Sequence, residues 1–500
     1  MNYEALISLA IYFILMLAIG LYAYRKSTSD VSEYMLGGRQ LHPAVGALSA
    51  GASDMSGWML MGLPGAVFVS GISAAWIAVG LTIGAYLNYL LVAPRLRVYT
   101  EMADDAITIP DFFEKRFHDK TRALRVLSSV VIVIFFTLYT SAGIVAGGKL
   151  FEASFGLDYR IGLFLTAGVV VAYTLFGGFL AVSLTDFVQG CIMFVALVLV
   201  PIVTYFVLRD EGAWATAAAS VPSGYFGWWP EGMTVLGLIS LLAWGLGYFG
   251  QPHIIVRFMA IRSLKDIATA RYIGMSWMIV TVIGAVLTGI VGYAYTYANG
   301  VPVDDPETIF IILSQVLFHP LVAGFLLAAI LAAIMSTISS QLLVSSSSLT
   351  EDFYRTFLRK EASQGELVAV GRVSVLIVSL VAIALAFDRS SNILSLVGNA
   401  WAGFGAAFGP IILLSLYWRG LTRDGALSGM IVGAGTVLFW LYAPIEIDGK
   451  SLSSIIYEIV PGFLLGGATA ILVSIIGRNV KPHVVHRFNE MEKVMNQDAG

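Results

Sequence analysis

Long apolar stretches follow one another along this chain from near its first residue to about residue 476. Most are longer and poorer in charge than the core helices of soluble proteins, which is typical of segments that cross a membrane. Their apolarity is continuous rather than alternating, so the pattern predicts helices and not the strands of a closed barrel. Thirteen spans are expected, at residues 6–24, 44–69, 75–93, 127–148, 161–179, 187–208, 235–249, 272–295, 321–343, 368–387, 393–418, 426–442 and 455–476.

Two of these stretches are interrupted by residues that weaken a helix. The second contains the run Gly51-Ala-Ser-Asp-Met-Ser-Gly-Trp58, and the seventh leads into Trp244-Gly-Leu-Gly-Tyr-Phe-Gly-Gln-Pro252. Glycine and proline destabilise a helix locally, and interrupted segments at matching places in two halves point to the binding site of a transporter. The alternative is that these glycines only permit close packing of helices.

The interrupted stretches are five spans apart, and an odd spacing makes the second unit enter the membrane from the opposite side. The sequence therefore predicts an all-α membrane protein with a five-plus-five inverted repeat, in which helices two and seven are discontinuous. The expected division is a first helix with its inner loop (1–43), a first repeat unit of helices two to six (44–208), a second unit of helices seven to eleven (233–418), helices twelve and thirteen (419–477) and a cytoplasmic tail (478–500).

The distribution of lysine and arginine predicts the orientation. If the N-terminus lies outside, 24 of the 29 basic residues fall on the inner side, with Arg257 in an inner loop. The outer side then keeps Lys149, Arg160, Arg209, Arg389 and Lys450. Since positive residues accumulate on the cytoplasmic side, the chain is expected in the bacterial cytoplasmic (inner) membrane, with its N-terminus outside and its C-terminus in the cytoplasm.

Composition narrows the classes of function. Only 12% of the residues are charged, against about a quarter in soluble domains. The net charge is −3 and the basic residues do not gather in one patch, so no nucleic-acid partner is expected. The sequence contains no Walker loop, dinucleotide fingerprint, HExxH motif or Gly-x-Ser-x-Gly elbow, which argues against an enzyme. An ion gradient is the expected energy source and the lipid bilayer the expected surroundings, and no obligatory protein partner is evident.

Several residues in the interrupted spans and the ninth span have chemistry that suits transport. Asp54 lies about ten residues inside its span, where a carboxylate implies a cation or a buried partner; it either serves sodium binding, directly or indirectly, or caps broken backbone. Ser336 and Thr337 offer hydroxyl oxygens that suit a hard cation, although such hydroxyls also bond backbone carbonyls. Four aromatic residues could pack against an apolar ring of a substrate or could serve only the packing of the helices. They are Trp58, Tyr139, Trp244 and Tyr248.

Four stretches carry a resemblance to a known family. They are Gly51 to Trp58, Gly177 to Gln189, Trp244 to His253 and Ala332 to Thr337. Over essentially its whole length the chain resembles the sodium/solute symporter family, and the first and third stretches resemble its proline-carrying members. The resemblance implies a LeuT-type fold around a midplane site, and sodium-coupled uptake of L-proline by alternating access, with the sodium ion as the co-transported ion.

The same resemblance implies roles for individual residues. It assigns the sodium site to the backbone carbonyls of Ala52 and Met55 together with Ala333, Ser336 and Thr337, and it makes Asp54 essential for sodium coupling. The positions associated with substrate binding are Ser56, Gly57, Trp58, Tyr139, Trp244, Tyr248 and Pro252. Arg39 matches a residue linked to coupling, and Asp186 matches one linked to sodium access or gating.

Three alternatives to this function remain open on the sequence. The first is a member of the same family that carries another small solute, such as a different amino acid, a carboxylate, a sugar or a vitamin. The second is coupling to protons in place of sodium, with Asp54 as the titrating group. The third is a membrane module that senses a solute for a partner protein.

Overall fold

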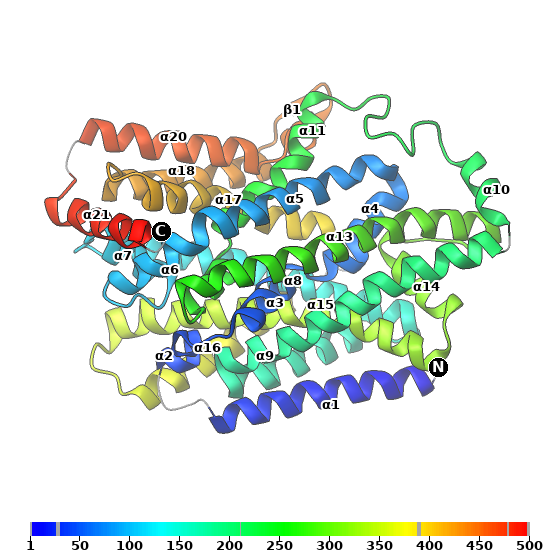
Figure 1. The fold of residues 1–500 in the computed structure, drawn as a ribbon, viewed down its shortest axis with the longest axis horizontal. Helices are drawn as coiled ribbons and strands as arrows, with labels where there is room; N and C mark the ends of the chain where they lie inside the picture. The colour runs from blue at the N-terminus through cyan, green and yellow to red at the C-terminus, as the bar shows by residue number, and fades with distance from the viewer. Residues whose placement is uncertain (1–2, 27–30, 211, 388–391, 478–479, 498–500) are drawn as a thin grey trace.

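Long helices run roughly side by side along the longest dimension of the molecule (Figure 1). The computed structural model describes residues 3–26, 31–210, 212–387, 392–477 and 480–497. The first half contains α1 (Tyr3–Lys26), α2 (Val31–Leu36), η1 (Gly37–Arg39), α3 (Pro43–Asp54), η2 (Trp58–Gly62), α4 (Leu63–Ser70), η3 (Gly71–Ala74), α5 (Ala75–Leu87), η4 (Asn88–Val92), α6 (Ala93–Met102), α7 (Ile109–Phe117), α8 (Ala123–Phe155), α9 (Tyr159–Asp210) and α10 (Ala213–Ser220).

The second half is also helical apart from one short hairpin. It contains α11 (Val235–Leu242), η5 (Ala243–Gly250), α12 (Pro252–Ala260), α13 (Leu264–Asn299), η6 (Pro306–Thr308), α14 (Ile309–Leu317), α15 (Pro320–Ser347), η7 (Ser348–Leu358), α16 (Gln364–Leu385), α17 (Ile393–Tyr417), α18 (Arg423–Tyr442), α19 (Leu452–Ile455), α20 (Ile459–Gly477) and α21 (Pro482–Gln497). The strands β1 (Glu446–Ile447) and β2 (Lys450–Ser451) pair antiparallel. The all-α prediction is confirmed.

The number of membrane spans depends on how broken helices are counted. Within the described ranges, ten helices are long and apolar enough to cross a membrane, and eleven if Val235–Gly250 and Pro252–Ala260, bent by 45°, form one span. The region of the predicted span 161–179 contains a shorter apolar helix, Tyr159–Leu175. The prediction of thirteen spans and the division into repeat units therefore stay predictions.

The fifth and sixth predicted spans follow one another at a kink, with no loop between them. The segment α9 covers both, but at Gly178 its backbone is not helical, with φ 57° and ψ −150°, so two helices meet there. A β-carbon at this position would lie 2.5 Å from the Tyr34 side chain and 2.8 Å from the Tyr34 carbonyl oxygen. Glycine is needed here because it alone tolerates both the positive φ and the close approach of α2.

The helix α15 lies at the centre of the molecule. Nearly all its residues are buried, and it packs against α1, α3, α8 and α9. Figure 1 shows α2, α7 and α21 at one end of the molecule and α10 and α14 at the other. Of the predicted outer basic residues, Arg389 lies outside the described residues, as do positions 478–479 and 498–500 of the predicted tail. The described part of the tail is α21, which packs on α6.

Candidate functional site

The second predicted span is broken where α3 ends at Asp54. Beyond this point the Ser56 amide donates to the Asp54 carbonyl at 3.0 Å. In a continued helix that amide would instead have bonded the carbonyl of Ala52. The break therefore leaves backbone oxygens free to bind something other than their own helix.

Four of the five residues predicted for sodium meet at this break. The Ser336 hydroxyl of α15 lies 2.6 Å from the Ala52 carbonyl oxygen and 3.1 Å from that of Ala333. The Thr337 hydroxyl lies 3.2 Å from the same Ala333 carbonyl. The fifth residue, Met55, directly follows α3 with non-helical backbone angles. A cluster of uncharged oxygens from two helices fits a hard monovalent cation. The same hydroxyls also bond backbone carbonyls, which is the alternative role given to them in the sequence analysis.

Replacing Ser336 with alanine is expected to raise the sodium concentration that gives half-maximal thermal stabilisation of the purified protein by about tenfold or more. The prediction assigns the serine oxygen to sodium as one ligand, and a polar contact to a charged group is worth about 1.5–3 kcal/mol. The matched control is Ser347→Ala, since Ser347 is also buried on α15 but its hydroxyl bonds only Leu343 of the same helix, at 2.9 Å. Equal sodium titrations for the two variants would contradict the assignment.

Asp54 is buried, with 2% of its surface exposed. Its Oδ2 accepts a hydrogen bond from the Tyr248 hydroxyl of η5, while its backbone oxygen accepts one from Trp58 Nε1 at 3.0 Å. Within the described residues Oδ1 has no hydrogen-bond partner, and Asp54 forms no ion pair with the basic side chains there. The carboxylate thus joins the two broken spans and keeps one oxygen free.

The residues predicted for substrate binding gather around the two breaks with one exception. Gly57 packs so closely that an added β-carbon would lie 3.0 Å from Ala146 of α8 and 3.3 Å from Ile334 of α15. The second break falls between η5 and α12, which Pro252 begins. Trp244 instead stacks on the Tyr457 ring at a centroid distance of 5.3 Å.

The remaining predicted substrate residues are also buried at or near the breaks. These are Ser56, Trp58, Tyr139 and Tyr248. Tyr139 of α8 lies near Ser56 and Asp54. The helix α8 therefore contributes to the predicted substrate site together with the two breaks. The breaks and α8 therefore bring together polar backbone and aromatic surface, which suits a small amphipathic solute.

Asp186 is placed in a buried ion pair that the sequence did not predict. Its Oδ2 lies 3.1 Å from Arg257 Nη2 and accepts a hydrogen bond from the Ser49 hydroxyl at 2.7 Å. The Ser340 hydroxyl of α15 is 3.5 Å away. Arg257 was predicted in an inner loop, and this prediction is wrong, because Arg257 lies within the helix α12 and is completely buried. A single arginine in the apolar run after Pro252 was the available signal.

Arg39 joins separate segments at the end of the molecule where α2 and α7 lie. It donates to the Asp105 carboxylate at 2.7 Å, to the Ala106 carbonyl at 2.6 Å and to the Met259 carbonyl of α12 at 3.0 Å. Beside it, Leu41 and Ile261 form a parallel bridge. Burial lowers the pKa of the Arg39 guanidinium, and the bond to Asp105 opposes that shift. These contacts hold the beginning of α3 against the end of α12.

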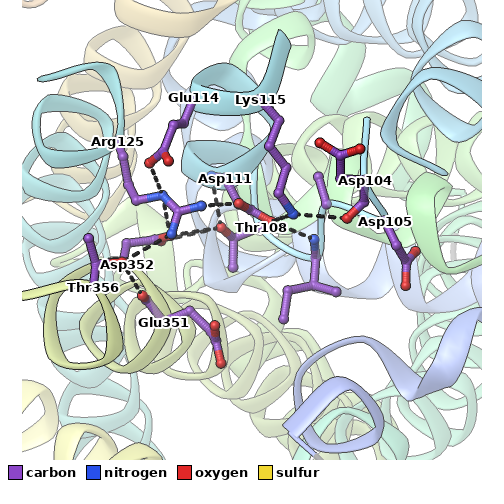
Figure 2. Close-up of polar contacts among 12 residues, drawn as sticks. Asp104, Asp105, Thr108, Asp111, Glu114, Lys115, Arg125, Glu351, Asp352 and Thr356 are labelled. Carbon is purple, nitrogen blue, oxygen red and sulfur yellow. Dashed lines mark hydrogen bonds and ion pairs between the residues drawn. The ribbon is translucent and has the colours of Figure 1, made fainter. Parts of the chain in front are cut away.

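Asp104, the chain neighbour of Asp105, belongs to a charged network, which Figure 2 shows between α7, α8 and η7. Lys115 lies 3.0 Å from the Asp104 carbonyl oxygen and 2.8 Å from the Asp111 carboxylate. Arg125 pairs with Asp111 and also with Glu114 at 2.6 Å. The fully buried Asp352 accepts a hydrogen bond from Thr108 at 3.1 Å and lies 3.7 Å from Arg125. This end of the molecule is thus closed by linked polar contacts, which suits a gate.

Replacing Arg39 with glutamine is expected to let this end open more often. A cysteine introduced by Ala260→Cys in a Cys191→Ala background should then be alkylated about tenfold faster, because Ala260 is buried beside the lost contacts and tenfold corresponds to about 1.4 kcal/mol. Arg39→Lys should have a similar effect, since one ammonium does not replace a planar guanidinium. Arg209→Gln is the control, because Arg209 pairs with Asp210 at the surface. An unchanged alkylation rate in both Arg39 variants would contradict the prediction that the contacts of Arg39 keep this end of the molecule closed.

Comparison with known proteins identifies the family. The model of the sodium:solute symporter family matches residues 34–433. The chain belongs to the sodium:solute symporter family. It is therefore an integral membrane symporter that moves sodium together with a solute, and not an enzyme.

Curated relatives of the symporter match it along its whole length. It is 59% identical over 497 residues to the osmoregulated proline transporter OpuE of Bacillus subtilis (strain 168), covering 99% of this chain and 100% of the relative. It is 54% identical over 501 residues to the sodium/proline symporter of Staphylococcus aureus (strain JH9), covering 99% of this chain and 97% of the relative.

Solved structures of transporters share the fold of the symporter. A substrate-bound, outward-open sodium-coupled sialic acid symporter matches with a TM-score of 0.79 and 18% identity, covering 95% of this chain and 98% of that one. The structure of MhsT in complex with L-phenylalanine matches with a TM-score of 0.51 and 13% identity, covering 86% of this chain and 98% of that one. At these identities the likeness shows the fold alone.

Proposed function

We propose that this symporter takes up L-proline with sodium across the bacterial cytoplasmic membrane. The observation that carries the proposal is the identity of 54% across 99% of the chain with a sodium/proline symporter. The likeness to an osmoregulated proline transporter, at 59% identity, supports the same substrate. A zwitterionic imino acid also suits a site in which broken backbone meets aromatic side chains.

Sodium binds where α3 breaks, to the carbonyls of Ala52, Met55 and Ala333 and the hydroxyls of Ser336 and Thr337. The 2.6 Å approach of Ser336 to Ala52 supports this set of ligands. Proline then occupies the space beside both breaks. Its contacts are assigned to Ser56, Gly57, Trp58, Tyr139, Trp244, Tyr248 and Pro252.

Coupling follows from alternating access between two repeat units, residues 44–208 and 233–418. Sodium and proline favour the same conformation, so each raises the affinity for the other. Asp54 senses the cation, while Arg39 and Asp186 control opening. Each sodium ion that moves with the zwitterion carries one net charge, which is worth about 2.3 kcal/mol at 100 mV, or roughly a 50-fold concentration ratio. The N-terminus lies outside and the C-terminus in the cytoplasm, as the 23 basic residues predicted on the inner side besides Arg257 support.

Uptake of radiolabelled proline into proteoliposomes tests this function. With an inward sodium gradient, the wild-type protein should accumulate proline, and replacement of sodium by potassium should abolish accumulation. Competition with unlabelled amino acids, carboxylates and sugars measures the selectivity. Correctly inserted protein that accumulates no proline, but responds to another solute, would overturn the proposed substrate. Accumulation driven by a pH step without sodium would overturn the proposed coupling ion.

A further inference from the structure

A small cavity lies beside the broken end of α3 and is not lined by Ser336. It has a volume of about 20 Å³ and is lined by residues of α3, α5, η4, η5, α12 and α13. Asp54, Asn88 and Tyr248 supply polar groups to its wall, while Met275 and Met278 supply apolar ones. A space of this size holds about one water molecule or one small ion. It is far too small for an amino acid.

Asn88 is the unexpected member of this wall. Its side chain is 1% exposed, and neither its amide oxygen nor its amide nitrogen has a hydrogen-bond partner among the described residues. It begins η4, a segment of π-helix inserted between α5 and α6, and such insertions are frequent at functional sites. A buried amide whose donor and acceptor both lack partners is costly, so the site needs an occupant that bonds it.

Asp54 differs from the other buried aspartates of the proposed site and the charged network. Asp186 has Arg257 at 3.1 Å, and Asp352 has Arg125 at 3.7 Å. Asp54 has no basic partner in the described part of the chain, and its unpaired Oδ1 belongs to a residue of the cavity wall. Among the described residues that line the cavity, none is a lysine, arginine or histidine. An unpaired carboxylate among apolar helices is costly unless a cation compensates its charge.

We propose that Asp54 and Asn88 form a second coordination site for sodium, separate from the site formed by Ala52 and Ser336. The ligands on this chain are Asp54 Oδ1 and the Asn88 amide oxygen, and the Tyr248 hydroxyl holds the carboxylate in place through Oδ2. This inference rests on the sodium coupling proposed above. The broken end of α3 then presents oxygen ligands on two sides, toward α15 and toward η4.

The chemistry of the cavity favours a cation over a water molecule. The two unpaired oxygens are both acceptors, so a water molecule bonds them but leaves the carboxylate charge uncompensated. A sodium ion accepts electron pairs from both oxygens and neutralises that charge as well. The amide nitrogen of Asn88 remains available to donate to a water molecule that accompanies the ion.

Thermal unfolding of the purified full chain in lipid nanodiscs, titrated with sodium chloride, tests the inference without any transported solute. Choline chloride keeps the ionic strength constant. A ligand that binds the folded state stabilises it according to its dissociation constant. Asn88→Leu preserves the size of the side chain and removes both polar atoms. We expect it to raise the sodium concentration for half-maximal stabilisation at least tenfold. Asn299→Leu is the matched control, since the Asn299 amide bonds its own helix at Tyr295.

Each outcome distinguishes this inference from the proposed function. A sodium response of Asn88→Leu equal to that of wild type would show that the cavity holds water only and would overturn the second site. If Asn88→Leu does not fold, Asn88→Asp takes its place, and an unchanged half-maximal sodium concentration in that variant overturns the inference equally. A wild-type protein that sodium does not stabilise would overturn both sodium sites, whereas failed proline uptake with normal sodium stabilisation would overturn only the proposed substrate.

Discussion

Asp54→Asn should raise the sodium concentration needed for half-maximal uptake by roughly 30-fold to several-thousand-fold. The variant keeps the size of the side chain but removes the charge, and the carboxylate is buried with no basic partner among the described residues. Truncating one partner of a buried, hydrogen-bonded charge pair costs about 2–5 kcal/mol, and each 1.4 kcal/mol is about tenfold. The cation that loses its counter-charge here is sodium. Uptake into proteoliposomes at a series of sodium concentrations measures the effect.

Asp210→Asn is the matched control for this experiment. Asp210 carries the same carboxylate at the end of α9, but its side chain is 66% exposed and pairs with Arg209. Its removal should leave the sodium dependence unchanged, because exposed pairs contribute about 0–1 kcal/mol. If Asp54→Asn protein elutes as a monodisperse species and keeps the wild-type sodium dependence, Asp54 serves only to cap the broken backbone.

Replacing Arg257 with leucine should lower the free energy of unfolding by about 3–5 kcal/mol. The substitution leaves Asp186 as a buried charge whose remaining contacts are the Ser49 and Ser340 hydroxyls. Both members of the ion pair are completely buried, so water does not compensate the lost attraction. Reversible unfolding in mixed micelles measures the change.

The double variant Asp186→Asn with Arg257→Leu separates charge from packing. It removes the unpaired carboxylate and should therefore be more stable than Arg257→Leu alone, since uncharged groups are cheaper to bury. Arg209→Leu, at the exposed pair with Asp210, should change stability by less than about 1 kcal/mol. A double variant as unstable as the single one would show that Arg257 acts through its packing and not through its charge.

The helices that carry the site were predictable, because the signals are local. A membrane span needs a long apolar run, and glycine or proline interrupts it wherever the chain places them. For this reason the break at Asp54 and the break before Pro252 could be located from the residues beside them. The helix α12 was missed, because Arg257 suggests a loop to any rule that counts charges.

The pairing of the buried charges required the tertiary structure. Asp186 and Arg257 are 71 residues apart, and Tyr248 and Asp54 are 194 residues apart. The sequence places each of these groups inside an apolar region, but it does not say which face of each helix meets which neighbour. The free-energy cost of a buried charge depends on that neighbour. The structure places Arg257 beside Asp186, whereas no basic side chain among the described residues pairs with Asp54, whose Oδ1 is left without a partner.

The sequence by itself determined the class of protein, its all-helical architecture and the two interruptions, because each of these follows from short stretches of chain. Only the tertiary structure decided that the Ser336 hydroxyl reaches the Ala52 carbonyl, 284 residues away, and that Asn88 shares a cavity with Asp54. A ligand site is a set of distances between helices. Those distances are set by how complete helices pack together, and a local pattern of residues does not contain them.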